Sequence, residues 1–117
     1  GLSGSLKQRR TSSTRSIAEE AERYIQENFQ NPDLTVDSVC SHLHISQSYF
    51  STIFKQETGQ SYIQYLTGVR MNRAVELLRG TDDKTYLVAQ QVGYDDPNYF
   101  SYVFKKRFGK SPTQFRK

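Results

Sequence analysis

An internal repeat constrains the fold of this chain more than any other feature. Residues 48–65 read SYFSTIFKQETGQSYIQY and residues 98–115 read NYFSYVFKKRFGKSPTQF, with eight of eighteen positions identical. Upstream, VCSHLHIS at 39–46 aligns with VAQQVGYD at 88–95, one residue out of step with the longer match. Only two copies are present, which argues against a solenoid of at least about three repeats. The pattern indicates one duplicated structural unit.

Each copy predicts a short helix, a tight turn and a longer helix, which is the helix-turn-helix plan. Thr35 and Ser46 are suitable N-caps for the two helices of the first copy. In the second copy, Asp96 precedes Pro97, which suits an N-cap followed by proline at the first helical position. No stretch shows the apolar alternation typical of a strand. The prediction is an all-α fold of about seven helices, forming two helix-turn-helix subdomains joined by a long linker helix.

The domain boundaries follow from composition and capping signals. The first stretch is rich in Gly, Ser, Thr and bases, and we interpret it as a disordered linker or cloning remnant. Ser16 and Glu19 form an S-x-x-E capping box, which predicts the first helix start. The predicted parts are the linker (1–15), the first helix-turn-helix subdomain (16–60), the linker helix (61–80) and the second helix-turn-helix subdomain (81–117).

Composition excludes several classes of protein. No apolar run approaches the length of a membrane span or a secretory signal. A single cysteine, Cys40, excludes an internal disulfide framework and agrees with a cytoplasmic location. The formal net charge is +4, and residues 98–117 carry six bases and no acid. A localised basic surface suits a polyanion such as nucleic acid, although a merely solvated charged surface explains the charge equally well.

Signals for catalysis or metal binding are weak. His42 and His44 lie close to Cys40, but Cys40 is predicted to point inward while His42 points elsewhere, so no metal site is expected. The pairs Asp82-Asp83 and Asp95-Asp96 stand at helix starts, where capping explains them better than acid/base chemistry. We find no nucleophile arrangement and no glycine-rich phosphate loop. The expectation is a protein that is not an enzyme and needs no cofactor or metal.

Three motifs carry a family resemblance over Leu34–Arg116. They are S-x-x-Y-F-x-x-x-F-K at 46–55, the Arg70…Ala74…Leu77-Leu78 pattern of the linker helix, and the run from Val92-Gly93-Tyr94 through Ser111-Pro112 to Arg116. The chain resembles the DNA-binding domain of AraC/XylS-type bacterial transcription regulators. The stretch G-Y-x-D-P-x-Y-F at 93–100 is most similar to members fused to response-regulator receivers.

The resemblance implies sequence-specific binding of double-stranded DNA as the output domain of a transcription regulator. Two recognition helices are then expected to enter successive major grooves. The implied partners are DNA, RNA polymerase as a further candidate, and an N-terminal sensor or receiver domain outside this chain, with no membrane partner. His44 departs from the glycine that the family often has, and that the second copy has at Gly93. Because this turn position often needs a positive φ, we expect His44 in the left-handed region.

The candidate DNA contacts divide into two sets. Inward-facing aromatic and aliphatic residues leave a polar face at the start of each recognition helix, and the resemblance places base readers there. The base-contact candidates are Gln47, Ser48, Ser51, Thr52, Asn98, Ser101 and Tyr102. The phosphate-contact candidates are Lys55, Lys105, Lys106, Lys110 and Arg116. No arginine lies on either base-reading face, so we expect modest base selectivity. For Ser51, Ser101, Lys55 and Lys105, an ordinary solvated surface residue stays an open alternative.

A second class of function also stays open. The alternative is a helical protein-interaction module that contacts RNA polymerase or a sensor domain, with one copy degenerate for DNA. The acidic first predicted helix, from Ser16 to Phe29, is the best candidate for such a surface. RNA binding is disfavoured, because the chain lacks a sheet platform with stacking aromatic residues.

Overall fold

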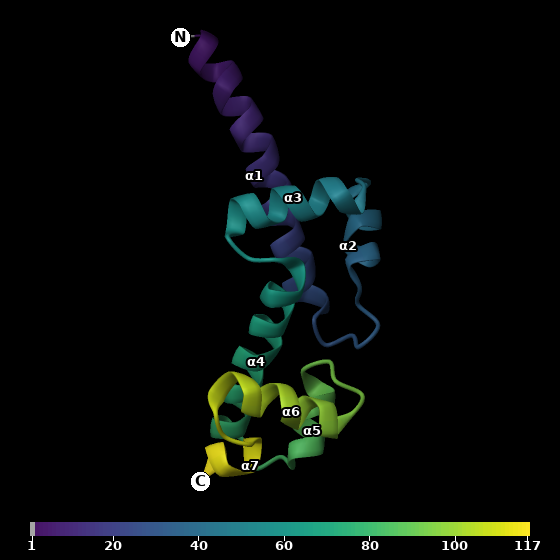
Figure 1. Cartoon of the computed structure of the whole chain (residues 1–117), viewed down its shortest axis with the longest axis vertical. Coiled ribbons are helices and arrows are strands. Elements are labelled where there is room, and N and C mark those ends of the chain that lie inside the picture. The colour runs from purple at the N-terminus through teal and green to yellow at the C-terminus, as the bar shows by residue number, and fades with distance from the viewer. Residues whose placement is uncertain (1) are drawn as a thin grey trace. The chain divides into compact units, whose positions relative to one another are not determined.

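The computed structural model describes the backbone of residues 2–117 and the side chains of residues 13–117. All regular structure in this range is helical, which confirms the predicted all-α fold (Figure 1). The helices are α1 (Leu2–Asn28), α2 (Val36–Leu43), α3 (Gln47–Thr58), α4 (Tyr62–Gly80), α5 (Thr85–Gln91), α6 (Pro97–Phe108) and α7 (Pro112–Arg116).

The chain divides into two compact units. Unit 1 comprises Gly1–Glu27 and Leu34–Tyr65, and unit 2 comprises Asn28–Asp33 and Leu66–Lys117. Unit 1 therefore contains the α2–turn–α3 copy and unit 2 the α5–turn–α6 copy. Helix α4 gives its first residues to unit 1 and the remainder to unit 2. That residues 61–80 act as a separate linker stays a prediction.

Helix α1 begins earlier than its sequence predicts. The capping box at Ser16 and Glu19 predicted a helix start, but α1 begins at Leu2. Ser16 and Glu19 lie within the helix, so the predicted start is wrong. A sequence that suits an N-cap does not make a helix start there when the residues before it are also helical. That residues 1–15 form a linker stays a prediction, and most of their side chains lie outside the described residues.

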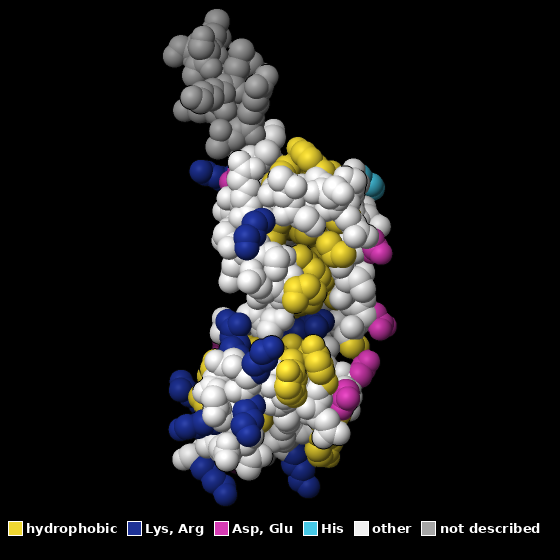
Figure 2. Space-filling model, viewed as in Figure 1, with side chains coloured by type: hydrophobic (Ala, Val, Ile, Leu, Met, Phe, Trp, Pro, Cys, Tyr) yellow, Lys and Arg dark blue, Asp and Glu magenta, His cyan; other side chains and the backbone are white. Residues whose placement is uncertain are grey.

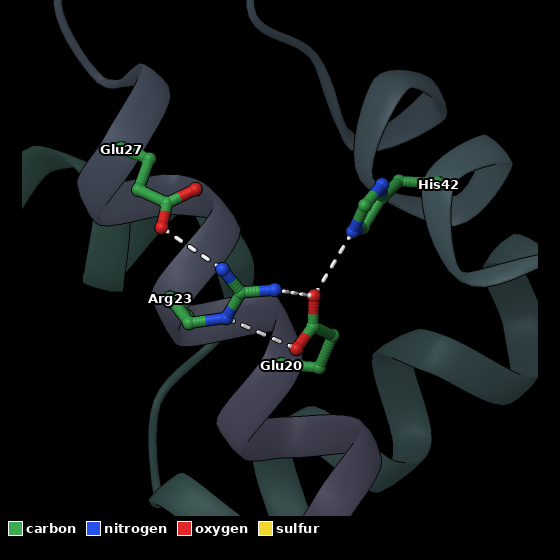
Figure 3. A network of polar contacts seen from close by, with 4 residues as sticks. All are labelled: Glu20, Arg23, Glu27 and His42. Carbon is green, nitrogen blue, oxygen red and sulfur yellow. Dashed lines mark hydrogen bonds and ion pairs between the residues drawn. The ribbon is translucent and has the colours of Figure 1, made fainter.

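A polar network joins α1 to α2 in unit 1 (Figure 3). Arg23 donates to Glu20 and to Glu27, the latter over 2.9 Å. The Nε2 atom of His42 lies 3.0 Å from Oε1 of Glu20, and the His42 ring stacks on Tyr24 with centroids 4.3 Å apart. The apolar side of α1 is buried at Ala18, Ala21 and Ile25. Burial and the network together hold α1 against the helix-turn-helix of unit 1.

An arginine clamp organises unit 2. Arg70 is 9% exposed; its Nε donates to the carbonyl of Phe29 over 2.9 Å and its Nη2 to that of Asn31 over 3.0 Å. The guanidinium also lies 5.3 Å from the ring centroid of Tyr94. A buried cation needs such acceptors to replace its water. Arg70 thereby ties residues 28–33 to the rest of unit 2.

The repeat is confirmed in the junction that follows each recognition helix. Gly59 and Gly109 both have φ of 78° and donate to the carbonyls of Lys55 and Lys105. Two residues later, a serine and a glutamine bond reciprocally in both copies, at Ser61–Gln64 and Ser111–Gln114. Edge-to-face aromatic pairs follow at Phe54–Tyr65 and Phe104–Phe115, with centroids 5.5 and 5.4 Å apart.

Candidate nucleic-acid interface

The two candidate recognition helices begin at the predicted caps. The Ser46 hydroxyl accepts from the backbone N–H of Tyr49 at the start of α3. The Asp96 carboxylate accepts from the N–H of Asn98 at the start of α6. These caps fix where each helix begins, and a recognition helix contacts bases chiefly through its first turns.

Helix α3 presents a neutral polar face. Phe50, Ile53 and Phe54 are buried, while the four base-contact candidates of unit 1 are exposed: Gln47, Ser48, Ser51 and Thr52. The Thr52 hydroxyl donates to the carbonyl of Ser48 over 3.0 Å, which leaves its methyl group and its oxygen lone pairs for a partner. The Gln47 side-chain amide donates to the Asp37 carboxylate.

Helix α6 presents a more aromatic face. Asn98 is exposed, Tyr102 is 60% exposed and Ser101 is half-buried. The Tyr102 ring stacks with Tyr99 at a centroid distance of 6.4 Å, and Nζ of Lys106 lies 5.9 Å from the Tyr102 ring. The structure thus brings all predicted base readers onto exposed or half-exposed helix faces, three on α6 and four on α3.

The two turns share one hydrogen-bond pattern. His44 has φ of 60°, as predicted, and it is the single non-glycine residue with a positive φ in the described backbone. The N–H groups of His44 and Ile45 donate to the carbonyls of Ser41 and Cys40, as those of Gly93 and Tyr94 donate to Gln90 and Ala89. Gly93 has φ of 100°, and a Cβ added there falls 2.3 Å from the Phe29 carbonyl oxygen.

A hollow lies between α2 and α3, lined by Asp37, Cys40, Ser41, His44, Ile45, Ser46 and Gln47. Burial raises the pKa of the Cys40 thiol, and the negative charge of Asp37 raises it further. The thiol therefore stays protonated and unreactive near neutral pH. No group of three or more His, Cys, Asp or Glu residues is positioned to hold a metal ion among the residues described.

Basic side chains concentrate in unit 2. Its residues include ten bases against six acids, whereas unit 1 includes six bases against six acids. Figure 2 shows Lys and Arg side chains gathered over the α6–α7 part of the chain. Four predicted phosphate contacts are exposed: Lys55, Lys105, Lys106 and Lys110.

Arg116 occupies a different position. Its Nε, Nη1 and Nη2 atoms donate to the carbonyls of Leu78, Asp83 and Thr81, over 3.0, 2.5 and 3.2 Å. These bonds tie α7 to the end of α4 and to the loop before α5. Because all three guanidinium nitrogens have backbone acceptors, the geometry argues against the predicted phosphate contact, and we assign Arg116 a structural role.

The sequence interpretation missed Asp37 and Tyr99. Asp37, in the first turn of α2, contacts the candidate base reader Gln47. Tyr99 is 56% exposed and stacked on Tyr102. Tyr49, at the equivalent position of the repeat, is 49% exposed.

Comparison with known proteins places this geometry in a family. The sequence model of the helix-turn-helix domain matches residues 39–117. In the C-terminal domain of AraT, a response regulator from Geobacillus stearothermophilus, 46% of residues are identical, with a TM-score of 0.84 over 86% of this chain and 83% of that one. The chain belongs to the AraC-type helix-turn-helix family.

Two further relatives support the membership. The C-terminal domain of the two-component response regulator yesN from Fusobacterium nucleatum is 35% identical, with a TM-score of 0.83 over 85% of this chain and 96% of that one. The uncharacterized transcriptional regulator YisR of Bacillus subtilis is 41% identical over 86% of this chain and 35% of its own length. This AraC-type domain spans about a third of the length of the first curated relatives it matches.

The family is one of DNA-binding transcription regulators, and the two helix-turn-helix units are its DNA-binding fold. This membership points to a protein that is not an enzyme. A helix able to cross a lipid bilayer, which needs about 20 apolar residues, is not found in the described part of the AraC-type domain.

Proposed function

We propose that this domain reads a bipartite operator as the output part of a longer bacterial transcription regulator. The observation that carries the proposal is the pair of capped helices, α3 and α6, each with buried aromatic residues behind an exposed polar face. Each helix is expected to enter a major groove, which admits one α-helix.

The base contacts fall to the exposed polar faces. Gln47 and Asn98 carry amides that can pair with adenine in the major groove, and Tyr102 can meet a thymine methyl group. Ser48, Ser51, Thr52 and Ser101 can accept or donate to several base edges. The affinity that is independent of sequence falls to Lys55, Lys105, Lys106 and Lys110, which are exposed and can contact phosphates.

The remaining partners are proposals drawn from the relatives. The matched curated proteins are about three times longer than this chain, and two matched structures are C-terminal domains of response regulators. We therefore place a receiver or other sensor domain upstream, and RNA polymerase as a second protein partner. A regulator that binds the bacterial chromosome acts in the cytoplasm. An interaction-only role is not favoured, because the family binds DNA.

Selection from a random duplex pool tests this function. We expect two short conserved boxes, with affinity that falls steeply as salt concentration rises. Asn98→Ala should lower affinity for the selected duplex about fivefold or more and relax one position of one box. Asn72→Ala, an exposed asparagine of α4 outside both recognition helices, is the matched control. Enrichment no better than that of scrambled DNA at low salt refutes the proposal.

A further inference from the structure

We infer that Asp37 is a positioning residue that holds Gln47 as an adenine reader in the first half of the operator. The inference rests on the proposed function, because it assumes that α3 faces bases. It assigns a role to a residue that is not itself among the candidate DNA contacts, and it names the base that α3 selects.

The contact between the two side chains has only one chemically sensible orientation. Asp37 lies in the first turn of α2 and Gln47 is the first residue of α3, ten positions later. An ionised carboxylate only accepts hydrogen bonds, whereas the glutamine amide has a donating NH₂ end and an accepting oxygen. The NH₂ end of Gln47 must therefore face Asp37, as the structure has it, and Oε1 points away from the carboxylate.

The surroundings of Asp37 support a fixed geometry. Asp37 and Gln47 line the same hollow as Ser46, the cap of α3. The backbone between them is held by the capping box of Thr35 and Ser38 and by the turn at His44. Asp37 and Gln47 both belong to helices with N-caps, so their backbones are held in place. The contact therefore restrains the side chain of Gln47. Gln47 then gives up less side-chain freedom when it meets DNA.

The restrained amide matches one base better than the other three. One hydrogen of the NH₂ group is used by Asp37, which leaves one donor and the carbonyl acceptor. Adenine presents an acceptor at N7 and a donor at N6, so it can pair with both. Cytosine offers only a donor, and guanine and thymine offer only hydrogen-bond acceptors at their base edges in the major groove.

Unit 2 has no counterpart on its recognition helix, but it offers a control. Pro97, the first residue of α6, has no side-chain donor. A second aspartate–glutamine contact joins Asp83 to Gln91 over 3.0 Å, and Gln91 lies in α5 rather than in a recognition helix. Asp83→Asn therefore removes the same charge as Asp37→Asn and alters the same kind of contact, away from the base-reading faces.

The experiment measures base preference at one position of the selected duplex. Gln47→Ala first locates the base pair whose discrimination depends on Gln47. The unmodified chain, Asp37→Asn and Asp83→Asn are then titrated against duplexes with each of the four bases there. We expect adenine to be preferred by the unmodified chain. Asp37→Asn should reduce that preference about fivefold or more. Asparagine can donate as well as accept, so the side-chain amide of Gln47 can then flip and exchange its NH₂ and oxygen ends. Asp83→Asn should leave it unchanged.

A double substitution keeps the test independent of stability. In the Asp37→Asn background, Gln47→Glu provides a side chain that only accepts, and it should move the preference to cytosine. A preference of the unmodified chain for guanine or thymine overturns the inference, as does an adenine preference that Asp37→Asn leaves intact. Both outcomes leave the proposed function standing. Loss of all sequence preference in the unmodified chain overturns both.

Discussion

The turns of the two helix-turn-helix copies have the same hydrogen bonds but different requirements. In unit 1 the turn residue is His44, which adopts φ of 60° with its side chain exposed. In unit 2 the equivalent Gly93 has φ of 100° and its Cα faces the Phe29 carbonyl and Arg70. The first turn needs only a tolerable backbone conformation. The second also needs the absence of a side chain, because a segment distant in sequence packs against it.

The faces of the two recognition helices differ as well. Helix α3 offers mainly neutral polar side chains, the exposed ring of Tyr49 and one lysine near its end, Lys55. Helix α6 offers an aromatic pair, and Lys105, Lys106 and Arg107 stand in its last turn. We expect unit 1 to contribute more to base selectivity and unit 2 more to affinity that is independent of sequence.

The largest expected effect is that of Gly93→Ala. A Cβ at this position overlaps a backbone oxygen that cannot move aside cheaply, and φ of 100° is strained for alanine. Unit 2 should lose about 3 kcal/mol of unfolding free energy. Hydrogen exchange of the α5 and α6 amides measures the loss, with the α2 and α3 amides as the internal reference. Protection unchanged in α5 and α6 would contradict the packing argument.

The matched substitution in unit 1 is His44→Gly. Glycine removes the strain of a left-handed histidine but adds backbone freedom to the unfolded chain, so stability should stay within about 1 kcal/mol or rise. A thermal melt compares the variant with the unmodified chain. A clear drop in melting temperature would show that the His44 side chain stabilises the turn.

Arg116→Lys separates a structural role from a DNA contact. Lysine keeps the charge but cannot form the three-way fork to the carbonyls of Leu78, Thr81 and Asp83. We expect a loss of about 2 kcal/mol in unfolding free energy, measured by urea denaturation, with the salt dependence of DNA binding unchanged. Unaltered stability together with weaker DNA binding would restore Arg116 to the phosphate contacts.

Lysine substitutions test whether unit 2 contributes more than unit 1 to the salt-dependent part of DNA affinity. Replacing Lys105, Lys106 and Lys110 together by glutamine should reduce the slope of log affinity against log salt by about 0.9 for each phosphate that the protein no longer neutralises. Lys55→Gln should reduce it by about 0.9 at most. Titrations of one selected duplex at several salt concentrations give both slopes. Equal slopes for the triple variant and the unmodified chain would remove these lysines from the interface.

The smallest expected effect concerns the network of Figure 3. The hydrogen bond from Arg23, followed by that from His42, holds the pKa of Glu20 below its usual 4.5. The folded state therefore gains stability from ionised Glu20 above that value, and loses it as the pH falls through the lowered pKa. Glu20→Gln should lower the melting temperature of the chain at pH 7. The difference from the unmodified chain should shrink steadily as the pH falls below 4.5 and Glu20 becomes protonated; a difference that stays constant through this fall would contradict the linkage.

Local signals in the sequence were sufficient for most of the fold. The caps at Thr35, Ser46 and Asp96 were predictable because a cap depends on residues within one turn. The left-handed turn at His44 was predictable because its counterpart in the repeat is a glycine. The start of α1 was not, since the same local rule offered Ser16 as a cap inside a longer helix.

The contacts that the sequence did not predict depend on parts of the chain that are distant in sequence. Arg70 and Arg116 donate to carbonyl groups, which every residue carries, so no residue type marks the acceptor. Likewise, the spacing of Asp37 and Gln47 has no helical period, because a turn separates them. Predicting these contacts requires the three-dimensional path of the chain.

The Arg70 clamp has a consequence for modular engineering. A chimera that transplants residues 66–117 alone would carry Arg70 and Gly93 without the Phe29 and Asn31 carbonyls that they meet. The exchangeable second module is therefore discontinuous in sequence, and it includes the short segment 28–33. Shuffling at the start of α4 would separate an arginine from its acceptors, whereas shuffling at residue 27 keeps them together.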